Sequence, residues 1–127
     1  MEIINISGRV SDILIDSGIK NGLVNIWVPH TTATLVVNEN DTALWEDILS
    51  VLSRLIPLRA DYSHNDKYRD SSREQNAYAH ILNCLIKPNI MIPLKNGMMA
   101  LGEWQSFLFV ELDGPRIRSV SFQIFGA

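Results

Sequence analysis

His30, His64 and His80 are the residues of this chain best suited to chemistry, because imidazole binds metals and exchanges protons near neutral pH. His30 follows a strand-like run, His64 lies in a polar stretch typical of a loop, and His80 lies on an expected helix. Together, three imidazoles can bind a divalent metal, zinc above all, and leave one coordination position open. The alternative is that the three are unrelated, since no compact HxxxH or CxxC pair supports a metal site.

A second group of charged residues surrounds a predicted turn at Asp113-Gly114, between two strand-like segments. A two-residue turn there predicts a hairpin with Glu111, Arg116 and Arg118 on one face. The same face continues into aromatic and aliphatic side chains, so it should contact the core, where an unpaired charge is costly. Two interpretations are open: a structural ion pair between Glu111 and Arg116, or an anion pocket in which arginine binds phosphate or carboxylate.

The composition indicates one small domain, expected in the cytoplasm. The chain has 127 residues, 46% of them hydrophobic, and 11 basic against 14 acidic side chains, for a net charge of -3. This length can bury a core, and the charge does not indicate nucleic-acid binding. The single Cys84 lies among apolar helical positions, so we expect it to be buried and not disulfide-bonded. Neither a signal peptide nor a membrane-spanning run is apparent.

Strands are predicted from alternating apolar residues bounded by turn signals. We expect two of them to pair around a corner that contains His30, and two others to form a hairpin across Lys95-Asn96-Gly97. Strand-like segments before the final hairpin lie at 3–10, 23–28, 33–39, 90–94 and 98–101.

Helices are predicted from apolar spacing and capping residues. Asn40 or Asp41 is suited to cap a helix over about 42–55, whose apolar face should be core. A later helix is expected to start near Ser71, where Glu74 completes a capping box, and to place Asn76 and His80 on one face. The long polar stretch 59–72 is typical of a functional loop. Residues 11–19 are expected to form a short helix or an extended turn.

The order of motifs along the chain resembles the secondary thiamine-phosphate synthase family (YjbQ-like). The resemblance covers about residues 3 to 126 and depends on the whole ordered set. The matching pieces are His30-Thr31-Thr32-Ala33, Asn38-Glu39, His64, Asn76-Ala77-Tyr78-Ala79-His80, Pro93 to Gly97, Leu101-Gly102-Glu103-Trp104-Gln105 and Glu111-Leu112-Asp113-Gly114-Pro115-Arg116. The stretch Asp70 to Asn76 departs from the family's usual acidic segment, and Glu103 replaces a small polar residue.

The resemblance implies a compact single α+β domain, with a large antiparallel sheet in a sandwich-like arrangement and two or three helices. It implies a homotrimer with a polar pocket near a subunit interface, where the histidines gather and zinc can bind. The implied activity joins a thiazole phosphate to a hydroxymethylpyrimidine pyrophosphate and releases pyrophosphate. No nucleic-acid or membrane partner is expected.

Candidate site residues follow from the motifs and the resemblance together. A competing hypothesis makes the chain a metal-binding trimer without this activity. The expected catalytic residues are Glu39, Glu111, Arg116 and Arg118, the substrate-binding residues Thr31, Thr32, Asn38, Asn76 and Gln105, and the metal ligands His30, His64 and His80.

Overall fold

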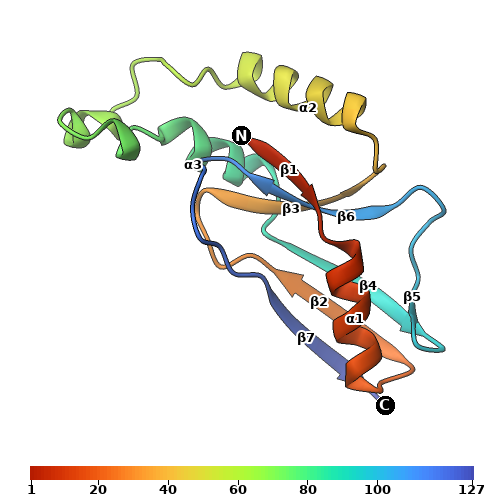
Figure 1. The fold of residues 1–127 in the computed structure, drawn as a ribbon. Coiled ribbons are helices and arrows are strands. Elements are labelled where there is room, and N and C mark those ends of the chain that lie inside the picture. The colour runs from red at the N-terminus through yellow and green to blue at the C-terminus, as the bar shows by residue number, and fades with distance from the viewer.

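The computed structural model describes all 127 residues and has an α+β fold, with two antiparallel sheets and three α-helices (Figure 1). One sheet has the strand order β1-β6-β3 and the other β5-β4-β2-β7. The elements are β1 (Glu2–Asn5), α1 (Ser7–Ser17), β2 (Gly22–Trp27), β3 (Ala33–Asn38), α2 (Thr42–Leu55), α3 (Ala77–Leu85), β4 (Asn89–Lys95), β5 (Met98–Met99), β6 (Ser106–Glu111) and β7 (Ser121–Gly126), with two 3-10 turns, η1 (Asn65–Tyr68) and η2 (Ser72–Glu74). None of the helices is long and apolar enough to span a bilayer.

Strand β6 is the centre of the molecule, because it is buried on both faces. Its alternate side chains contact two different hydrophobic clusters. Phe107 and Phe109 pack with residues of β2 and α1, between the two sheets. Leu108 and Val110 face the other way, toward α3 and the partly buried apolar side of α2. Helices α2 and α3 therefore cover the outer face of the three-stranded sheet.

The predicted hairpin between 104–112 and 115–125 is wrong. β6 pairs with β1 and β3, whereas β7 pairs with β2 in the other sheet. Pro115 would occupy the closing position of the turn, where a hairpin needs a backbone N–H that proline lacks. The chain after Asp113 instead crosses from one sheet to the other, and residues 114–120 are called the crossing segment below. The predicted pairing of β2 with β3 is wrong for the same topological reason, since these strands also lie in different sheets.

Helix α2 and the β4–β5 hairpin, which depend on neighbouring residues in the chain, form as the sequence predicts. Helix α2 spans the predicted residues, and the Asp41 carboxylate accepts hydrogen bonds from Ala43 N at 2.8 Å and Leu44 N at 3.2 Å. The hairpin of β4 and β5 turns at Asn96 and Gly97, which both adopt the positive φ that a tight turn requires.

Three local predictions need correction. Ser71 makes no side-chain capping bond, and the helix that carries His80 begins six residues later, at Ala77. The first strand ends at Asn5, after which α1 starts. Cys84 is exposed rather than buried.

Candidate functional site

The end of β6 carries a buried ion pair between Glu111 and Arg118. Arg118 Nε donates to Glu111 Oε2 at 2.7 Å and Nη2 donates to Oε1 at 2.6 Å. Arg118 Nη2 also donates to Thr32 Oγ1 at 2.8 Å, because Glu111 lies opposite Ala33 at the start of β3. Side-chain exposure is only 11% for Arg118 and 6% for Glu111. A two-point pair this deeply buried holds the ends of the two strands together.

Arg116 binds Asp113 and not Glu111, so the structural interpretation, a Glu111–Arg116 pair, is wrong. Arg116 Nε and Nη2 donate to Asp113 Oδ2 at 3.0 and 2.7 Å. Nη2 also approaches Glu74 Oε1 at 3.4 Å. The Asp113 backbone N–H donates to Glu111 Oε1 at 2.9 Å and joins the two pairs. Both arginines are therefore occupied by protein carboxylates.

Asn76 connects this charged cluster to two of the histidines. Its Nδ2 donates to Asp113 Oδ2 at 2.7 Å, and its Oδ1 lies 3.3 Å from His64 Nε2. The rings of His64 and His80 meet edge to face, with centroids 4.9 Å apart. The site is thus a continuous row from Arg116 through Asp113 and Asn76 to the histidine pair.

His30 makes a separate contact. Its Nε2 accepts a hydrogen bond from the Ser119 backbone N–H at 2.9 Å, which attaches the crossing segment to the connection between β2 and β3. No group of three or more His, Cys, Asp or Glu side chains in the chain is arranged to hold a metal ion. The donor set of one chain therefore does not complete a three-histidine zinc site, although it brings His64 and His80 together.

Burial and neighbouring charges set the protonation of the row. Burial, followed by the charge of His64, lowers the pKa of His80. Burial alone would raise the pKa of Glu111, but the Arg118 hydrogen bonds, the Asp113 N–H and the two arginine charges lower it overall. Burial, then Asp113 and Glu111, raise the pKa of Tyr78. Near neutral pH the site thus combines an uncharged His80, an ionised Glu111 and an intact Tyr78 hydroxyl.

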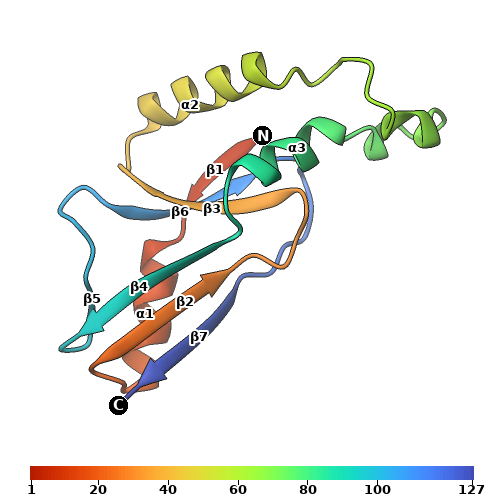
Figure 2. The same ribbon diagram turned by 180° about the vertical axis from the view of Figure 1, so that it is seen from behind.

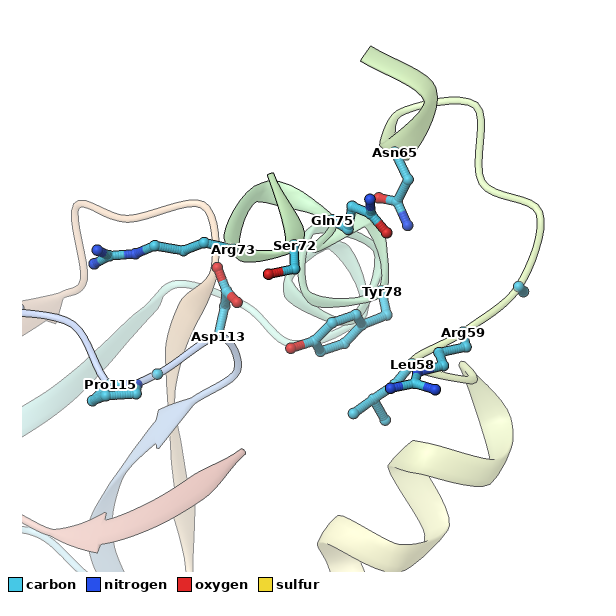
Figure 3. Close-up of a pocket in the computed structure, with 11 residues that line it drawn as sticks. Leu58, Arg59, Asn65, Ser72, Arg73, Gln75, Tyr78, Asp113 and Pro115 are labelled. Atoms are coloured by element: carbon cyan, nitrogen blue, oxygen red, sulfur yellow. The ribbon is translucent and has the colours of Figure 1, made fainter. Parts of the chain in front are cut away.

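A cavity of about 830 Å³ lies beside this row (Figure 3). The Tyr78 ring projects from α3 among the lining residues with its hydroxyl toward Asp113, while Leu58 and Arg59 lie on the other side of the ring (Figure 3). Asp113 belongs to both the cavity wall and the hydrogen-bonded row. The remaining lining residues are Ala60, Asn65, Ser72, Arg73, Gln75, Gly114 and Pro115.

Several predicted site residues lie elsewhere. In the β3–β6 strand pair, Glu111 lies opposite Ala33 at one end and Ser106 lies opposite Asn38 at the other. These two ends of the paired strands are about 17 Å apart. Asn38, Glu39 and Gln105 are at the far end and are exposed, so a single chain does not bring these candidate residues to the histidine pair. Thr32 contacts Arg118, and Thr31 is exposed in the connection before β3.

Sequence reasoning overlooked the cavity residues Arg59, Tyr78 and Asp113. A signal existed for each of them. Arg59 opens the long polar stretch, Tyr78 lies inside the Asn76-to-His80 motif, and Asp113 lies in the turn motif. The sequence alone did not predict the path of the crossing segment, and this path brings Asp113 to the start of α3.

Comparison with known proteins identifies the family. The family model described as "UPF0047 protein YjbQ-like" matches residues 1–127. A UPF0047 protein of Methanothermobacter thermautotrophicus is 39% identical over 126 residues, covering 99% of this chain and 84% of that protein. The UPF0047 protein YugU of Bacillus subtilis is 32% identical, with coverages of 98% and 90%. The crystal structure of a hypothetical protein from Aeropyrum pernix K1 superposes with a TM-score of 0.92 at 37% identity, covering 99% of this chain and 90% of that one. This chain therefore belongs to the YjbQ-like UPF0047 family.

Proposed function

We propose that the protein is a transferase of the secondary thiamine-phosphate synthase type. It joins a thiazole phosphate to a hydroxymethylpyrimidine pyrophosphate and releases pyrophosphate. The observation that carries the proposal is the cavity of about 830 Å³ that shares Asp113 with the Asn76–histidine row. A cavity of this size is in the range that accommodates small-molecule ligands.

The reaction needs positive charge and fixed donors more than a protein nucleophile. The thiazole nitrogen forms a bond to the pyrimidine methylene carbon, the carbon–oxygen bond to pyrophosphate breaks, and its electron pair leaves with the pyrophosphate. Hydrogen-bond donors aimed at the developing charge stabilise such a transition state. Arg59 is the cavity guanidinium next to Tyr78, because the Arg73 side chain extends away from that ring (Figure 3).

Arg59 thus takes the phosphate role that the sequence suggested for Arg116 and Arg118. Those two arginines fix the site indirectly, by holding Asp113 and Glu111. The Tyr78 ring offers an apolar face for a heterocycle and a hydroxyl at its edge. His80, whose ring meets that of His64, supplies an N–H donor to the leaving oxygens.

The experiment is a pyrophosphate-release assay with both substrates, or either one, supplied. We expect release only with both, a loss of at least tenfold in Arg59→Met, and no change in the control Arg54→Met, whose arginine lies in the last turn of α2. Complementation of cells that lack their main thiamine-phosphate synthase should succeed with the wild type and fail with His80→Ala. Release that needs only one substrate would reject the proposal.

A second candidate is favoured by the 4.9 Å separation of the His64 and His80 rings. We propose as the alternative a metal-binding trimer in which this pair binds a divalent ion, zinc by ligand preference, and the other ligands come from outside the single chain. Elemental analysis should then find zinc at a fixed stoichiometry in the wild type, and none in His80→Ala. Bound zinc without turnover would favour this candidate over the transferase.

A further inference from the structure

We propose that Asn76 is a positioning residue that fixes His64 in the tautomer with its proton on Nε2, so that Nδ1 carries the free lone pair. The proposal is based on the hydrogen-bonded chain Asp113–Asn76–His64, in which each residue fixes whether the next one donates or accepts. The use of Nδ1 on a substrate rests on the proposed function, but the tautomer itself does not.

The Asp113 carboxylate is the fixed acceptor at one end of this chain of hydrogen bonds. An ionised carboxylate only accepts hydrogen bonds. Asp113 Oδ2 accepts from Arg116 Nε and Nη2 at 3.0 and 2.7 Å, and the backbone N–H of the same residue is held by Glu111. The acceptor is therefore ionic, fixed in place and directed at α3.

The second step is the amide of Asn76. A carboxamide has a donor end and an acceptor end, and only the NH₂ end can face Asp113. The Nδ2–Oδ2 distance of 2.7 Å fits a strong, charge-assisted bond. Asn76 is 4% exposed, so the reverse orientation would press Oδ1 against a carboxylate with little water to relieve it. The acceptor end Oδ1 must then face His64.

The third step is the imidazole. His64 Nε2 lies 3.3 Å from Oδ1, and two acceptors cannot share a hydrogen bond, so Nε2 carries the proton. In the neutral ring the lone pair is then on Nδ1. Of the two ring nitrogens, Nδ1 is thus the one available to a substrate.

His30 provides an opposite case in the same molecule. Its Nε2 faces the Ser119 backbone N–H at 2.9 Å, which can only donate. Neutral His30 must therefore be protonated on Nδ1. The structure assigns opposite tautomers to His30 and His64.

The test is nitrogen-15 NMR of the imidazole rings in chelator-treated protein at alkaline pH, with rings assigned by single His→Gln variants. We expect His64 to show a pyrrole-like Nε2 and a pyridine-like Nδ1, and His30 to show the reverse. In Asn76→Leu the His64 shifts should move toward each other as both tautomers become populated. In the control Gln75→Leu, whose amide donates hydrogen bonds to the carbonyls of Tyr68 and Arg69 and not to a histidine, they should stay unchanged.

A pyridine-like Nε2 on His64 in the wild type overturns the inference, and this holds even if Asn76→Leu fails to fold. An Asn76→Leu spectrum identical to the wild type also overturns it, because the asparagine would then not set the tautomer. The spectra are recorded without substrate, so a failure of pyrophosphate release counts against the transferase and not against the tautomer.

Discussion

The role of Arg118 depends on the residue with which it pairs. Its guanidinium makes a two-point pair with Glu111 and reaches Thr32, with no more than 11% of the side chain exposed. The sequence analysis predicted that Arg118 and Glu111 lie close together on one face of a hairpin. The two residues are close, but the hairpin does not form. An anion that competed for this guanidinium would leave Glu111 charged and unpaired in the core.

Replacing Arg118 with Met should therefore act on stability. Loss of one member of a buried pair costs about 3–5 kcal/mol, and we expect the free energy of unfolding to fall by that order in urea denaturation. Arg69→Met is the control, because the Arg69–Asp66 pair is exposed, at 78% and 65%, and such pairs contribute about 1 kcal/mol or less. Equal stability of the two variants would contradict a structural role for Arg118.

Glu111 should also make stability depend on pH in the acid range. Its folded pKa lies below the ordinary value of 4.5, so the unfolded chain takes up the proton first as the pH falls. The contribution of Glu111 is complete above the unfolded pKa and is lost as the pH drops through the folded pKa. Measured from pH 7 to pH 3, the free energy of unfolding should fall less steeply in a Glu111→Gln/Arg118→Met double variant than in the wild type. Parallel curves would contradict this assignment.

At the scale of elements, the sequence was informative where the structure depends on neighbours in the chain. Helix α2 follows from Asp41 and apolar spacing, and the β4–β5 turn follows from Asn96-Gly97. The same local rules failed at Asp113-Gly114, because pairing of β6 with β1 and β3 is decided by burial of both faces of β6. That error carried into the site, since the crossing segment after Asp113 decides which carboxylate each arginine meets.

The cap of α2 can be tested by substitution. Asp41→Ala removes the acceptor for two backbone N–H groups at the start of the helix, and such a loss typically costs about 1 kcal/mol. Asp47→Ala is a matched control, because Asp47 is an exposed residue within α2. Urea denaturation should separate the two variants by most of that amount. A smaller effect of Asp41→Ala than of Asp47→Ala would show that the cap does not stabilise α2.

At the scale of the whole molecule, one sheet face is uncovered. Helices α2 and α3 cover the three-stranded sheet, but Figure 2 shows the outer face of the β4-β2-β7 strands without a helix over it. A one-sided antiparallel sheet normally presents polar residues to water. The exposed residues on these strands instead include Leu23 at 41%, Trp27 at 49%, Met91 at 56% and Phe125 at 52%. The single chain exposes 8005 Å², whereas a compact monomer of 14.3 kDa exposes about 6800 Å².

This surplus of exposed surface, together with the exposed apolar residues of the sheet, is what supports the homotrimer that the family resemblance implies. We expect light scattering at micromolar concentration to give three times the chain mass. Met91→Glu should lower that mass, because Met91 pairs with Asn25 in the middle of the uncovered face and its side chain is directed away from the core. Val51→Glu, on an exposed position of α2, should leave the trimer intact. A monomeric wild type would refute the trimer, whereas a trimer dissociated by Val51→Glu and not by Met91→Glu would place the interface over the helices instead of the sheet.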